Sequence, residues 1–188
     1  LRGKSLAVTD ALVEDVLALE YGKARTFAVL AVLFPHVDTR NLFHVDHVFP
    51  AARFDKKALA ALVDENGTPT FSAEQIAELI ELRDTLPNLE LLPGLENIGK
   101  SDQAPDDWLA AQYASPDDRS AFLSRNALPS TLPHSIAEFM AFYEQRRDIL
   151  VARIQDKLRT QGPEPRASEE DLSEVALDEA LAEGDDEG

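Results

Sequence analysis

The feature of this sequence best suited to chemistry is an aspartate followed directly by a histidine. The pair is Asp46-His47, in the run His44-Val45-Asp46-His47-Val48-Phe49-Pro50. A carboxylate can hold a hard cation and an imidazole can take a proton from water, which together meet the needs of phosphodiester hydrolysis. An isolated pair of this kind is more often an ordinary histidine at a strand edge, so the hypothesis needs support from elsewhere in the chain.

Three later polar residues could complete such a site. Asn88 begins an apolar segment and can cap a loop through hydrogen bonds to backbone groups. Asn97 can offer its amide oxygen to a hard cation, and Lys100 can meet a phosphate. Each has a plain alternative when taken alone: Asn88 is a turn residue after Pro87, and the other two belong to an ordinary polar helix start.

Taken in order, these residues resemble a known family of nucleases. The chain reads D-H-x-x-P, then N-L-x-L-L, then N-x-x-K-S nine residues after Asn88. This combination resembles the HNH, or ββα-metal, nucleases, and the run 99–102 looks like the matching stretch of the HNH domain in the CRISPR RNA-guided nuclease. Over residues 10–160 the chain looks more like the C-terminal region of GmrSD-type restriction proteins, including the segment 106–109 and Arg146-Arg147.

The resemblance implies a role for each residue. His47 would be the general base that activates water, and Asp46 and Asn97 would hold one Mg²⁺ (or Mn²⁺) ion that stabilises the leaving 3′ oxygen. Asn88 would tie the loop to the strand and orient His47. Lys100 is a candidate phosphate contact.

His44 has two interpretations. It stands three residues before His47, a spacing that suits a metal pair on a helix, but the β-rich context and Pro50 argue against a helix there. In some HNH relatives this position is an acid that assists the metal. His44 is therefore a candidate metal ligand, or a residue that supports one, against a purely structural or hydrogen-bonding role.

The elements that must position these residues are mostly helical. Residues 42–49 and 88–92 are rich in β-branched, aromatic or leucine residues and predict two short strands. Thr9, Ser72 with Gln75, and Ser135 with Glu138 are helix-capping signals. The helices expected are two within 6–34, then 55–63, 72–84, a start at 96–101, one containing Pro105 and Trp108, 115–124 and 136–159.

We therefore expect a mainly α fold with a small two-stranded β element, and the resemblance implies an HNH core at about 42–110 inside a helical domain of residues 1–160. About forty residues separate His47 from Asn88, more than the compact motif requires, and the helices between them explain this. The zinc-binding cysteine pairs of many HNH proteins are absent, since the chain has no cysteine. Residues 161–188 hold eleven acids and one arginine, and predict a disordered tail.

Charge limits the function. The net charge is −17, of which the tail carries −10, so the body is acidic too. Strong electrostatic binding of DNA by this chain alone is not expected. No apolar run is long enough for a membrane span, and a cytoplasmic setting is the simplest interpretation.

The leading hypothesis is a metal-dependent DNA endonuclease in restriction or defence. A ParB-like NTPase domain before Leu1 would supply the grip and the specificity, as the resemblance implies. The alternative is a non-catalytic helical interaction module with an acidic tail that binds a basic partner.

Overall fold

The chain folds into seven α-helices and one two-stranded sheet within the residues that the computed structural model describes, 9–37, 42–94 and 100–160. The expectation of a mainly helical fold with a small β element is confirmed. The helices are α1 (Asp10–Leu17), α2 (Ala24–Leu33), α3 (Lys56–Ala61), α4 (Ala73–Leu82), α6 (Pro105–Gln112), α7 (Pro116–Arg125) and α8 (Phe139–Thr160). The strands are β1 (Phe43–His47) and β2 (Leu89–Pro93), and short 3-10 turns are η1 (Ala51–Phe54), η2 (Leu86–Asn88) and η3 (Ile136–Glu138).

The two strands pair antiparallel although about forty residues separate them in the chain. Asp46 lies opposite Glu90 and His47 lies opposite Leu89. Because side chains alternate along a strand and cross-strand partners share a face, Asp46 and Glu90 project from one face of the sheet and His47 from the other. This alternation decides which groups the site residues can reach.

Strand β2 is buried between two apolar clusters. Leu92 belongs to one, which gathers residues of η1, α3, α4, α6, α7 and the start of α8. Leu89 and Leu91 belong to the other, built from α1, α2 and the later part of α8. Residues 89–92 are all buried, including the charged Glu90 at 2% exposure. The strand therefore reads as a nearly continuous leucine run, because both of its faces lie against the interior.

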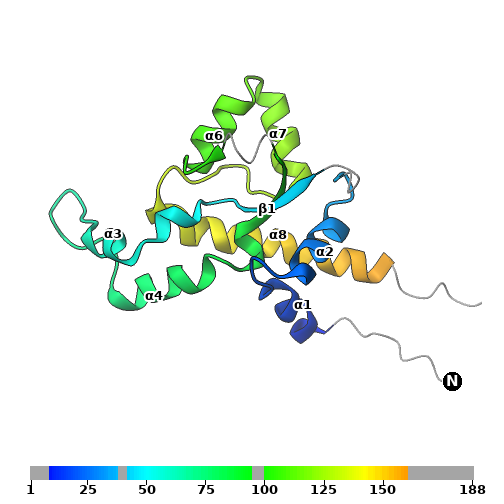
Figure 1. Cartoon of the computed structure of the whole chain (residues 1–188), viewed down its shortest axis with the longest axis horizontal. Helices are drawn as coiled ribbons and strands as arrows, with labels where there is room; N and C mark the ends of the chain where they lie inside the picture. The colour runs from blue at the N-terminus through cyan, green and yellow to red at the C-terminus, as the bar shows by residue number, and fades with distance from the viewer. Residues whose placement is uncertain (1–8, 38–41, 95–99, 161–188) are drawn as a thin grey trace, which may run out of the picture.

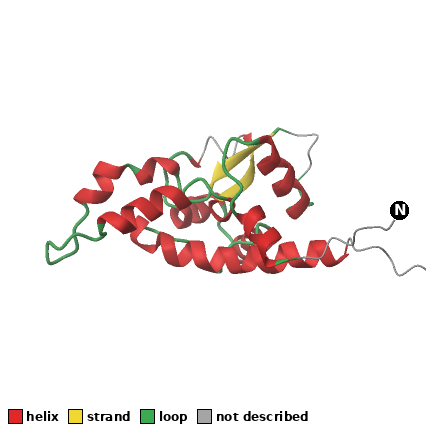
Figure 2. Ribbon diagram, turned by 90° about the horizontal axis from the view of Figure 1, so that it is seen from below, coloured by secondary structure: helices red, strands yellow, loops and turns green. Residues whose placement is uncertain are grey.

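Helix α8 runs along the long axis of the molecule, and α1 and α2 lie against it (Figures 1 and 2). From its middle the fully buried Arg146 reaches the start of β2, donating to the carbonyls of Pro87 at 3.1 Å and Leu89 at 2.8 Å. Burial lowers the pKa of Arg146 to about 10, and the nearby Glu90 carboxylate opposes that shift. Arg146 thus fixes the hairpin to the helix through backbone groups that would otherwise lack partners.

The helix ends match the capping signals in two cases of three. Thr9 caps α1, and Ser72 with Gln75 forms the expected capping box on α4. The predicted box at Ser135 is wrong: the side chain of Glu138 accepts instead from the backbone N–H of His134 at 2.9 Å, and η3 precedes α8. A glutamate three residues after a serine can accept a hydrogen bond from more than one nearby backbone N–H. Which N–H it meets depends on the direction of the chain before the helix, and the sequence does not specify that direction.

Two other expectations fall on residues that the structure does not describe. They are residues 96–99 of the helix start expected at 96–101, and the whole of the expected tail, 161–188. In the part of the chain that the structure describes, no helix combines the length and the apolar run needed to cross a membrane.

Replacing Arg146 should destabilise the fold severely. Arg146→Ala would leave two buried carbonyls without donors and Glu90 without its neighbouring cation, so we expect the free energy of unfolding to fall by roughly 3–5 kcal/mol. Urea denaturation followed by circular dichroism measures this. The matched control is Arg147→Ala on the next residue, whose ion pair with Glu14 is exposed and should contribute less than about 1 kcal/mol. Equal losses in the two variants would contradict the role given to Arg146.

Candidate active site

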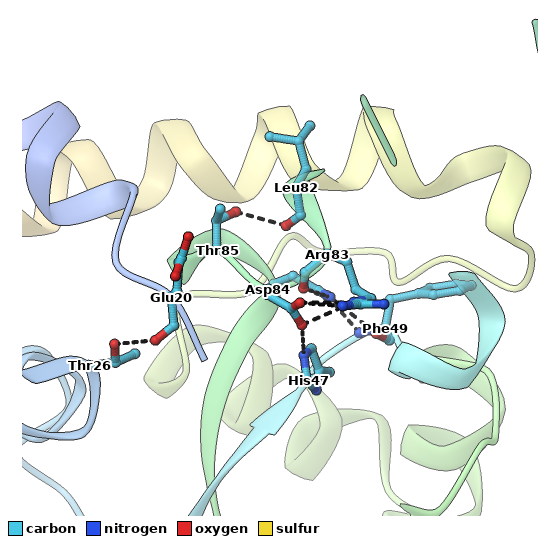
Figure 3. A network of polar contacts seen from close by, with 9 residues as sticks. Glu20, Thr26, His47, Phe49, Leu82, Arg83, Asp84 and Thr85 are labelled. Atoms are coloured by element: carbon cyan, nitrogen blue, oxygen red, sulfur yellow. Dashed lines mark hydrogen bonds and ion pairs between the residues drawn. The ribbon is translucent and has the colours of Figure 1, made fainter. Parts of the chain in front are cut away.

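The imidazole of His47 is held by a carboxylate that the sequence did not single out. His47 Nε2 lies 2.8 Å from Asp84 Oδ1, and Asp84 follows α4 in the loop that leads to β2. Arg83 binds the same carboxylate through Nε at 3.1 Å to each oxygen and through Nη2 at 2.5 Å. Figure 3 shows the ring at the end of β1 pointing towards Asp84, with the guanidinium on the far side of the carboxylate.

This arrangement sets the protonation of the network. The hydrogen bonds from Arg83, and then that from His47, hold the pKa of Asp84 below its usual range, so the carboxylate is ionised at neutral pH. An ionised carboxylate only accepts hydrogen bonds, so the His47 nitrogen facing it is the one that carries hydrogen. In neutral His47 the other nitrogen, Nδ1, is therefore the basic one.

The loop between α1 and α2 covers the imidazole. The ring of Tyr21 lies 4.5 Å from that of His47, centroid to centroid, at an interplanar angle of 36°. The backbone N–H of Tyr21 donates to the carbonyl of Asp84 at 2.7 Å, and the neighbouring Glu20 forms a β-bridge with Thr85. These contacts leave the His47 side chain only 10% exposed.

Asn88 is a clasp between β2 and the loop after β1. Its side-chain oxygen accepts from the N–H of Phe49 at 2.8 Å, and its Nδ2 donates to the carbonyls of Phe49 at 3.1 Å and Arg83 at 2.8 Å. Its own carbonyl accepts from the N–H of Val48 at 2.8 Å. Asn88 therefore ties the loop after β1 to the start of β2, as expected. The loop residues that it binds, Val48 and Phe49, directly follow His47 in the chain.

Asp46 meets a different set of partners, on the Glu90 face of the hairpin. The Lys100 ammonium donates to Asp46 Oδ2 at 3.0 Å, to Glu90 Oε1 at 2.5 Å and to the backbone carbonyl of His47 at 2.6 Å. It also lies 5.5 Å from the ring centroid of Trp108. Lys100 is 1% exposed and Asp46 25% exposed, so Asp46 is the accessible edge of this group, which we call the Lys100 cluster (Lys100, Asp46, Glu90).

The candidate residues thus divide between two faces. His47 lies with Asp84, while Asp46 lies with Glu90 and Lys100. Lys100 was expected to contact a phosphate, but its three protons already have three acceptors, so this conformation offers no free ammonium. Asn97 falls outside the described residues.

His44 is exposed and does not join either group. Its ring passes close to the backbone of Gly94, where an added Cβ would lie 3.5 Å from His44 Nε2. Within the described ranges, no three side chains of the His, Cys, Asp and Glu types gather closely enough to hold a metal ion. A metal set here would need amide or backbone oxygens beside the carboxylates.

A surface pocket of about 470 Å³ borders Asp46. It is lined by His44, Val45 and Asp46 from β1 and by residues 21–24 from the loop before α2. Lys23 in this loop is exposed and precedes the first turn of α2. The pocket therefore combines a cation and a helix N-terminus with the accessible carboxylate.

Sequence reasoning missed Asp84, Arg83 and Glu90. Glu90 carried a readable signal, because an acid between leucines of a buried strand must find a cation. Asp84 carried none, because its contact with His47 depends on how the loop after α4 approaches the end of β1.

Comparison with known proteins adds no relative: no family model and no curated protein matches this chain. The roles of these residues therefore rest on their geometry and chemistry.

The stability that Asp84 contributes should depend on pH. Its folded-state pKa lies below the ordinary aspartate value, so the contribution is present above pH about 4 and is lost as the pH falls through the folded-state pKa. We expect Asp84→Asn to lower the free energy of unfolding by roughly 1–2 kcal/mol at pH 7. Urea denaturation should show this gap narrowing steadily below pH about 4.

The matched control is Asp15→Asn at an exposed position of α1, which should change stability by less than about 0.5 kcal/mol at either pH. A gap for Asp84→Asn that stays constant from pH 7 to acid would show that the carboxylate charge contributes nothing.

Proposed function

We propose that this chain is a metal-dependent endonuclease of the HNH type that hydrolyses DNA phosphodiester bonds. The observation that carries the proposal is the oriented histidine: His47 Nε2 is bound to the ionised Asp84 at 2.8 Å, directly after a carboxylate-bearing residue, Asp46. The Asn88 clasp on the paired strand also supports it. In this proposal β1 and β2 are the two strands of a ββα-metal core, completed by the segment that bears Asn97.

The proposed chemistry is proton transfer to His47 during attack by water. His47 Nδ1 takes a proton as the water oxygen forms a bond to phosphorus and the bond from phosphorus to the 3′ oxygen breaks. Asp84 is a positioning residue that fixes the ring and stabilises the imidazolium formed. Asn88 holds the backbone of the adjoining loop, so that the ring keeps its direction.

The residues present fit a hard divalent ion, Mg²⁺ or Mn²⁺. Asp46 supplies an accessible carboxylate, Asn97 an amide oxygen, and the buried Glu90 Oε2 has no hydrogen-bond partner among the described residues. When bound, the ion would supply charge stabilisation for the phosphate and the leaving oxygen. His44, on the rim of the same pocket, is placed to assist by hydrogen bonding rather than as a principal ligand.

The pocket beside Asp46 is the proposed place of the scissile phosphate. Lys23 supplies the positive charge there that Lys100, held in its cluster, does not. The acidic body makes this grip weak, so a ParB-like NTPase domain in the same protein would bind and select the DNA. A role in restriction or defence, in the cytoplasm, is part of the proposal and rests on the resemblance to the restriction proteins alone.

One observation favours the alternative of a helical interaction module. A mostly apolar pocket of about 330 Å³ lies between α1, α2 and α8, lined by residues such as Val16, Val29 and Leu158, and Val32 on its edge is 55% exposed. Exposed apolar surface of this kind often marks a contact with another protein. Such a contact is compatible with a nuclease, so it becomes the main function only if cleavage fails.

Plasmid nicking with Mg²⁺ or Mn²⁺ tests the enzyme. We expect His47→Ala to reduce the rate by about 10²- to 10⁴-fold, because it removes the base. His134→Ala is the matched control, since His134 is 62% exposed beside Asp106 and lies on neither face of the hairpin; it should keep the wild-type rate. Nicking by the His47 variant at the wild-type rate, or none by the full-length wild-type protein with any metal or NTP, would reject the nuclease.

DNA binding at the pocket beside Asp46 has a separate test. Lys23→Glu reverses the charge beside Asp46, so we expect the Kd for a short DNA duplex at low ionic strength to rise by about tenfold and its salt dependence to weaken. Fluorescence anisotropy measures both. Lys57→Glu makes the same change at an exposed position of α3 and should have a smaller effect; equal effects would mean that only net charge matters.

A further inference from the structure

We propose that the oxygens around the Lys100 ammonium form a divalent-cation site, with Glu90 as a ligand, and that Lys100 fills it when no metal is bound. The site consists of Asp46 Oδ2, Glu90 Oε1 and the backbone carbonyl of His47, which we call the oxygen cradle. The proposal rests on the proposed nuclease function only for the use of the ion, and it adds the His47 carbonyl as a ligand and Lys100 as the cation that competes with the ion.

The pairing of β1 with β2, rather than the lysine, brings the oxygen atoms of the cradle together. Asp46 and Glu90 are direct partners in the strand register, and His47 is the next residue of β1. Their three oxygens converge on one point, at 2.5–3.0 Å from the ammonium nitrogen. Two carboxylates and a carbonyl are the oxygen donors that Mg²⁺, Mn²⁺ and Ca²⁺ prefer.

A single ammonium leaves this group incompletely satisfied. Glu90 is 2% exposed, yet its second oxygen, Oε2, has no hydrogen-bond partner among the described residues. Buried carboxylate oxygens usually have a partner, because leaving one without is costly. Two carboxylates face a single ammonium here, and Arg146, whose charge acts on Glu90, donates its hydrogen bonds to backbone carbonyls instead. A divalent ion can bind both carboxylates and can be held by both oxygens of one of them.

The geometry also provides a way in. Asp46 is 25% exposed and borders the pocket of about 470 Å³, so an ion arriving from solvent meets this carboxylate first. Lys100 then withdraws, which is a movement of one side chain.

The test is Mn²⁺ binding to the full chain, measured by electron paramagnetic resonance and by the midpoint of thermal unfolding, Tm. Lys100→Met removes the competing cation and keeps most of the side-chain volume. We expect this variant to be less stable than wild type without metal, to gain Tm saturably with Mn²⁺, and to bind Mn²⁺ about tenfold more tightly or better. Lys57→Met on exposed α3 is the control and should bind as wild type does.

Glu90→Gln tests the ligand itself. It keeps the size of the side chain, and Lys100 still pairs with Asp46, so it remains informative if Lys100→Met does not fold. We expect Glu90→Gln to weaken Mn²⁺ binding by about tenfold in the wild-type background, and to abolish the gain in the Lys100→Met background. Mn²⁺ binding that is indifferent to both substitutions would show that Lys100 is a structural ion pair and overturn the proposal.

The two proposals fail separately. Glu90-dependent Mn²⁺ binding without any nicking would keep this site and reject the nuclease. Nicking that depends on His47 while Mn²⁺ binding ignores Glu90 would do the reverse.

Discussion

The pairing of β1 with β2 is the contact on which the other features depend. It joins residues 43–47 to 89–93 across two intervening helices, α3 and α4, and it buries a strand that carries an acid at its centre. Such pairing across a long loop loses chain entropy before it gains hydrogen bonds, so it needs strong local closure. Asn88 provides this closure with three side-chain hydrogen bonds, and Arg146 secures the same strand to α8 through two more.

The two-stranded sheet also determines where ionisable side chains need a partner of opposite charge. One face presents Asp46 and Glu90, and they receive Lys100; the other presents His47, and it receives Asp84, whose charge Arg83 balances. Each of these ionisable side chains has a partner of opposite or complementary charge from another element or loop, as burial demands. Lys100 connects the two adjacent residues, because its ammonium binds the side-chain carboxylate of Asp46 and the backbone carbonyl of His47.

The sequence allowed the local features to be predicted, and for clear reasons. Thr9 and Ser72 cap helices because their hydroxyl oxygens meet N–H groups only two or three residues away. The strand at 89–93 and the tie made by Asn88 were also predictable, because a short leucine run after a proline turn is typical of a buried strand and the asparagine before it can bond to nearby backbone groups. The contacts of His47 with Asp84 and of Lys100 with Asp46 and the His47 carbonyl were not predictable, since each joins residues 37 or more positions apart and depends on the approach of whole elements.

The placement of Lys100 sharpens the question raised by the acidic charge of the chain. A nuclease needs cations where phosphate binds, yet the buried Lys100 is paired with two carboxylates of its own domain. Burying three charged groups together is rarely the most stable choice, since well-packed apolar residues of similar volume often serve at least as well. Among the described residues the cluster also leaves Glu90 Oε2 without a hydrogen-bond partner, beside an aspartate that borders a pocket. A purely structural ion pair gives no reason for that unpartnered oxygen, whereas a site that exchanges an ammonium for a divalent ion does.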